Sequence, residues 1–100
     1  MTNVDYYISK VCYNKEHTHI VKVKMHPSDN IDSSNIYTKL AVVEALEKGI
    51  VIYTMYKQND GKWYEGAKVR VVTTTSGNKY IRTDSNSTAK DNLGDLPEFC

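Results

Sequence analysis

Apolar and polar residues alternate along much of this chain with the period of two that a strand shows when one face of its sheet is buried and the other is solvated. The clearest case is His19–Met25, where Val21, Val23 and Met25 fall on one face and basic side chains fall on the other. Ile50–Tyr56 is apolar on both faces, which indicates a central strand. Further strands are predicted at Tyr6–Tyr13, Ala67–Thr74 and Lys79–Thr83.

One segment shows helical spacing instead. Leu40, Val43 and Leu46 recur every three residues, and Thr38 before them is a suitable N-cap. The predicted helix, 39–48, is too short to be stable alone in water. We therefore expect its apolar stripe to pack on a sheet.

The order of these elements is two strands, one helix and three strands, which predicts a single α+β domain over residues 1–100. The expected fold is a mostly antiparallel, twisted sheet of about five strands with the helix packed across it. Polar residues dominate Ser28–Asn35, which is predicted to be a loop. Gly66 is expected to break the regular secondary structure after the aromatic pair Trp63-Tyr64.

Charge and composition limit the compartment and the partners. The formal net charge of the 100 residues is only +1, so duplex nucleic acid, which usually requires a strongly basic domain, is not an expected partner. No run approaches the roughly 20 apolar residues of a membrane span and no signal pattern precedes Asp5, so we predict a cytoplasmic protein without a membrane partner. In a reducing cytosol Cys12 and Cys100 are expected to be free thiols.

The most specific motif lies in the last fifth of the chain, where Tyr80-Ile81-Arg82-Thr83 is followed by Asp91-Asn92-Leu93-Gly94-Asp95-Leu96-Pro97. With these segments and the predicted helix, the chain from about Ile8 to Glu98 resembles a family of small bacterial and phage proteins of unknown function. The resemblance implies a compact domain of one helix and one sheet, and it suggests ancestry in a mobile element. It implies no catalytic residue and no ligand.

The tail is interpreted first as a structural clamp. Arg82 lies close in sequence to several aspartates, and its planar guanidinium is suited to a bidentate ion pair that holds the tail against the last strand. Apolar tail residues would then cover an open edge of the sheet. In the alternative, Arg82 and Asn92 bind an anionic ligand. The aspartates are Asp84, Asp91 and Asp95, and the apolar residues are Leu93, Leu96 and Phe99.

Recognisable catalytic motifs are absent from the sequence, which has no glycine-rich phosphate loop, nucleophile elbow or paired-carboxylate motif. We therefore predict no catalytic residue, no cofactor and no enzyme activity. His17, His19 and His26 are interpreted as surface residues, and no metal site is predicted.

The leading functional hypothesis is a non-enzymatic module that binds an unknown host or phage protein, with a role related to host defence. Aromatic residues are enriched where binding energy concentrates, so Trp63, Tyr64 and Tyr56 are the predicted contact residues. A homo-oligomer is left open.

Two alternatives use positive charge. In the first, the protein sequesters a nucleotide-like anionic signal, with Lys68, Arg70 and Arg82 supplying charge and Tyr80 or Trp63 a stacking surface. In the second, single-stranded nucleic acid binds the solvated face of the sheet, where phosphates meet cationic groups and bases stack on tyrosines. The cationic residues of that face are Lys22, Lys24, His26, Lys68 and Arg70.

Overall fold

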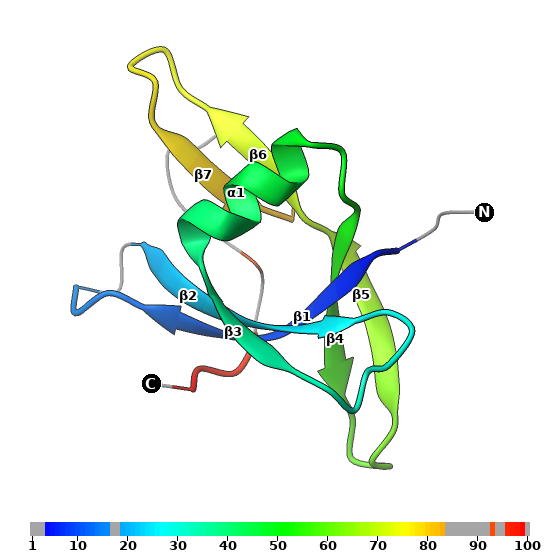
Figure 1. Cartoon of the computed structure of the whole chain (residues 1–100). Coiled ribbons are helices and arrows are strands. Elements are labelled where there is room, and N and C mark those ends of the chain that lie inside the picture. Colours follow the sequence, from blue (N-terminus) through cyan, green and yellow to red (C-terminus); the bar gives the residue numbers. More distant parts are fainter. Residues whose placement is uncertain (1–3, 17–18, 84–92, 94–95, 100) are drawn as a thin grey trace.

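The computed structural model describes residues 4–16, 19–83, 93 and 96–99. A five-stranded sheet and a two-stranded sheet flank a single helix among these residues (Figure 1). The elements in chain order are β1 (Tyr6–Tyr13), β2 (Ile20–Pro27), β3 (Asn35–Thr38), α1 (Lys39–Glu47), β4 (Ile52–Lys57), β5 (Trp63–Lys68), β6 (Arg70–Thr73) and β7 (Lys79–Arg82).

The larger sheet is mixed, with the strand order β3-β2-β1-β4-β5. Strand β4 runs parallel to β1, with Tyr6–Ile8 opposite Ile52–Thr54, whereas the other neighbouring strands are antiparallel. The α+β prediction is confirmed, but the expectation of a mostly antiparallel sheet missed this parallel pair. It arises because α1 carries the chain from the edge strand β3 back across the sheet before β4 begins.

The helix is capped as predicted, since the Ala41 N–H donates to Thr38 Oγ1 at 3.2 Å. Its buried face passes through Val42 and Val43, which join the core formed by β1 and β2. Leu40 was predicted in this stripe but is 66% exposed, because at about 100° per residue it falls outside a face centred on Val42, Val43 and Leu46. Within the described residues, no helix is long and apolar enough to cross a membrane.

Two predicted boundaries were wrong. Asn35–Thr38 forms the edge strand β3, which pairs antiparallel with β2, whereas Asn35 was predicted to end a loop and Thr38 only to cap the helix. Ala67–Thr74 is not one strand, because the chain leaves the larger sheet at the buried Val69 and continues as β6, which pairs with β7. The predicted single strand is therefore divided between the two sheets, with its first residues in β5 and its later residues in β6.

Gly66 lies inside β5 and does not interrupt it. A Cβ atom at this position would clash with Thr54 Oγ1 on β4, so the close approach of the two strands requires glycine. The same Thr54 hydroxyl accepts the Ala67 N–H at 3.0 Å, where the ladder between β4 and β5 is irregular.

The described part of the tail covers the edge of β1. The Val11 N–H donates to the Pro97 carbonyl at 3.0 Å, and the Phe99 N–H donates to the Val11 carbonyl at 3.1 Å. Leu93 is buried in the core and Leu96 packs against it. Covering by the tail is thus confirmed for these residues. Arg82 is 4% exposed, whereas its predicted partners Asp84, Asp91 and Asp95 lie outside the described residues.

Cys12 is disulfide-bonded, which contradicts its predicted free thiol. The prediction relied on a reducing cytosol, which disfavours a bond that the two cysteines can form only if the tail folds back, and residues 97–99 do lie beside Val11. The other cysteine of the sequence, Cys100, lies outside the described residues.

Replacing Cys12 with Ser is expected to lower the free energy of unfolding by roughly 2–4 kcal/mol, the usual effect of losing a disulfide from a small domain. Dithiothreitol should lower the melting temperature of the wild-type protein in the same way and leave that of Cys12→Ser unchanged. Equal melting temperatures of the wild-type protein with and without the reductant would show that the disulfide does not contribute to stability.

Candidate functional site

The candidate site forms where β1 and β4 separate. The two strands pair only as far as Ile8 and Thr54, after which β1 bonds to the tail through Val11. At the same point β1 contains a bulge, because Ile8 lies opposite Met25 and Lys10 lies opposite Lys24. The extra residue between them is Ser9. Bulges commonly redirect a side chain next to a functional site.

The bulge directs Ser9 toward His26 on β2. Ser9 Oγ lies 2.7 Å from His26 Nε2, and His26 Nδ1 lies 2.8 Å from the carbonyl oxygen of Ile31. A carbonyl oxygen only accepts, so Nδ1 carries the hydrogen, and in the neutral ring Nε2 accepts from the Ser9 hydroxyl. Both side chains are buried, at 3% and 6% exposure. The prediction of His26 as a surface residue was therefore wrong.

This pair lies at a pocket of about 480 Å³ on the sheet face opposite α1, a size within the range of small-molecule sites. Positive and aromatic groups dominate the lining, and no aspartate or glutamate is among the described residues that form it. The lining residues are Ser9, Lys10, Lys24, His26, Tyr56, Lys57, Trp63 and Pro97.

Trp63 forms one wall of this pocket, which we call the lysine pocket. The ammonium of Lys57 lies 5.6 Å from the centre of the indole ring, within the range of a cation–π contact. The His26 ring lies 5.9 Å from the indole ring and is tilted by 54°. The Trp63 side chain thus lies near both a cation and the histidine of the buried serine–histidine pair.

The lysine pocket contains a like-charge pair. Lys10 and Lys24 are directly opposed on the antiparallel strands β1 and β2, and both line the pocket. Like charges in this arrangement are destabilising. An anion between them would remove the repulsion, so the arrangement is suited to binding negative charge.

Tyr56 and Tyr64, two of the predicted contact residues, form a stacked pair with ring centres 5.9 Å apart. The Tyr64 hydroxyl donates to Asp60 Oδ2 at 2.5 Å. This hydrogen bond raises the pKa of the Tyr64 phenol and lowers the pKa of the Asp60 carboxyl. Tyr56 lines the lysine pocket, whereas Tyr64 lies in a neighbouring cavity.

That neighbouring cavity shares Trp63 with the lysine pocket and also contains Tyr7 and Glu65. The Tyr7 hydroxyl donates to Glu65 Oε1 at 3.1 Å. Burial, followed by this hydrogen bond, raises the pKa of the Tyr7 phenol. The acidic partner makes this cavity less suited to an anion than the lysine pocket.

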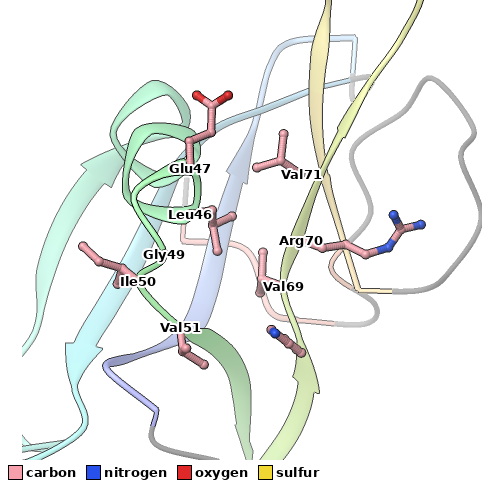
Figure 2. A pocket seen from close by; sticks show the side chains of 9 residues that line it. Leu46, Glu47, Gly49, Ile50, Val51, Val69, Arg70 and Val71 are labelled. Atoms are coloured by element: carbon pink, nitrogen blue, oxygen red, sulfur yellow. The ribbon is translucent and has the colours of Figure 1, made fainter.

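Lys68 and Arg70 line a different pocket, of about 370 Å³, between the end of α1 and the segment that joins β5 to β6. Figure 2 shows that aliphatic side chains form much of its surface and that the Arg70 side chain is directed away from the helix. The structure therefore does not bring these two predicted site residues to Trp63.

Tyr80 and Arg82, which are buried on β7, do not line the lysine pocket either. The Tyr80 ring stacks on His19 at 5.8 Å, and the Lys39 ammonium lies 5.0 Å from its centre. His17 lies outside the described residues. In the described part of the chain, no three His, Cys, Asp or Glu side chains are grouped to hold a metal.

Sequence reasoning missed four residues that line the pocket, namely Ser9, Lys10, Lys57 and Pro97. One signal was present, because the adjacent polar residues Ser9 and Lys10 break the alternation of the predicted strand Tyr6–Tyr13. Such a break is what a bulge produces.

With the fold and the lysine pocket described, comparison with known proteins identifies the family. The chain matches, over residues 7–97, the family described as a protein of unknown function (DUF3892), and it belongs to that family. This confirms the predicted resemblance to a family of unknown function. No curated protein and no solved structure matches the chain.

The opposed lysines give a stability prediction. Lys24→Gln is expected to raise the free energy of unfolding of the ligand-free protein by about 0.2–1 kcal/mol, since it removes a cross-strand repulsion. Urea unfolding at low salt measures the change, and high salt should reduce it. Lys22→Gln is the matched control, because Lys22 lies opposite Cys12. A loss of stability in Lys24→Gln would show that Lys24 is not repelled by Lys10.

Proposed function

We propose that this protein binds a small anionic, nucleotide-like ligand in the lysine pocket. The observation that carries the proposal is the convergence of Lys10, Lys24 and Lys57, from three different strands, on one cavity whose described lining has no acidic side chain. Two of these lysines are directly opposed, an arrangement that costs stability unless an anion lies nearby. This is the sequestration hypothesis of the sequence analysis with different cationic residues. The pocket lysines on β1, β2 and β4 take the place of Lys68, Arg70 and Arg82.

The positions of the cationic and aromatic side chains in the pocket suggest how such a ligand would lie. A phosphate group would contact the ammonium groups of Lys10 and Lys24, because charge-assisted hydrogen bonds to phosphate are among the stronger polar contacts. A planar base would lie against the indole of Trp63, which is only partly buried. A nucleotide-sized ligand uses both parts of the pocket, whereas a free base or inorganic phosphate uses only one.

A second candidate is binding of a host or phage protein, and the stacked Tyr56–Tyr64 pair favours it. These two residues are 41% and 36% exposed and lie beside Trp63 on the same hairpin. Exposed aromatic residues are typical of binding hot spots. Under either candidate we propose a role in host defence for a protein encoded by a phage or mobile element.

Trp63 is the single tryptophan of the chain, so its fluorescence reports directly on the lysine pocket. Titration of the full chain with adenosine 5′-monophosphate is expected to change this fluorescence saturably. Adenosine, which lacks the phosphate, should bind at least about tenfold more weakly, because one charge-assisted hydrogen bond is worth roughly 1.5–3 kcal/mol.

Lys24→Gln and Lys57→Gln should each weaken binding of the monophosphate, whereas Lys22→Gln, outside the pocket, should not. Equal affinity for adenosine and its monophosphate, or equal weakening by Lys22→Gln, would contradict the proposal. A response only to single-stranded oligonucleotides would favour nucleic-acid binding by the basic face instead.

A further inference from the structure

Simple binding of an anion does not account for the Ser9–His26 pair of the lysine pocket. An activated nucleophile is recognised by a nucleophile and a base within hydrogen-bond reach, with the base oriented by a third group. The pair meets this description, since Ser9 Oγ is 2.7 Å from His26 Nε2 and His26 Nδ1 is 2.8 Å from the carbonyl oxygen of Ile31.

The direction of these hydrogen bonds is the one that catalysis requires. Because the Ile31 carbonyl fixes the hydrogen on Nδ1, the lone pair of Nε2 faces the Ser9 hydroxyl and can take its proton. The carbonyl fixes the tautomer and ring orientation of the histidine, which is what the aspartate does in a Ser-His-Asp triad.

The surroundings supply positive charge beside the nucleophile. Lys10 follows Ser9 in the chain and Lys24 lies opposite Lys10, and all three residues line the same pocket. Fixed positive charge lowers the barrier when negative charge develops in a transition state, and a largely buried site strengthens the effect. In phosphoryl transfer most of the catalysis comes from such positioning and electrostatic stabilisation.

We propose that the lysine pocket hydrolyses a phosphate monoester through a phosphoserine at Ser9. The bond from Ser9 Oγ to phosphorus forms as the bond from phosphorus to the leaving oxygen breaks, and the Oγ proton passes through His26 Nε2 to that oxygen. A water molecule then gives its proton to His26 and attacks phosphorus. The Oγ–phosphorus bond breaks, Oγ regains the proton, and inorganic phosphate leaves. The reaction consumes the ester and water and needs no redox partner.

This inference rests on the proposed function, because the ester binds in the pocket assigned there to an anionic ligand. The test uses the full chain and p-nitrophenyl phosphate. Release of p-nitrophenol is followed by absorbance, and peptide mass spectrometry after an acid quench locates any phosphoryl group. Turnover should depend on Ser9, and any phosphoryl group trapped should be on Ser9.

Ser9→Ala should abolish turnover. His26→Gly should lower its rate by about 10²–10⁴-fold, the usual contribution of a general base, and added imidazole should restore part of the rate. A purely structural histidine would show no such rescue. Ser33→Ala is the matched control, because Ser33 is an exposed serine outside the pocket and its loss should change nothing.

The outcomes separate this inference from the proposed function. Saturable binding of adenosine 5′-monophosphate without turnover and without phosphoserine at Ser9 would overturn the inference and leave the binding proposal standing. Turnover retained in Ser9→Ala, or a phosphoryl group on another serine, would also overturn it. Absence of both binding and turnover would overturn both proposals. If Ser9→Ala does not fold, the position of the phosphoryl group in the wild-type protein decides.

Discussion

The candidate site depends on one edge of β1 pairing with two different segments, namely β4 and the C-terminal tail. Near its start β1 pairs with β4 as far as Ile8, and at Val11 the same edge bonds to Pro97 and Phe99 of the tail. Between these two pairings the edge carries Ser9 and Lys10, which line the pocket. A sheet in which β4 followed β1 along its whole length would leave no space there.

Local patterns predicted β1, β2, β4, β7, the helix and its cap, because these depend on residues close in sequence, whereas β3 and β5 were missed. Thr38 caps the helix as expected, and the whole of β1 was predicted from its content of β-branched and aromatic residues. The parallel pairing of β1 with β4 and the change of sheet at Val69 depend on residues far apart in the chain. Tertiary packing decides such features, and a single sequence carries little information on them.

The candidate site was predicted only in part, because the meeting of its residues also depends on packing between distant segments. Trp63, Tyr56 and the basic residue Lys24 were anticipated from residue type, and all three line one pocket. Lys68 and Arg70 are also cationic, but they lie at the end of β5 and the start of β6 and line a different pocket. Residue type thus identified candidates, whereas the irregular ladders of β1 and β4 determined which of them meet. Two features could be identified only once the register of β1 on β2 was known. They are the opposition of Lys10 and Lys24 and the buried pair of Ser9 and His26.

The central claim is that the gap between β1 and β4 holds an anion. Nuclear magnetic resonance of the full chain, titrated with adenosine 5′-monophosphate, tests it most directly, because the single indole N–H signal belongs to Trp63. We expect saturable shifts of that signal and of the Ser9, Lys10 and Lys24 backbone amides, with one shared dissociation constant. Shifts confined to β6 and β7, or shifts that do not saturate, would contradict the account.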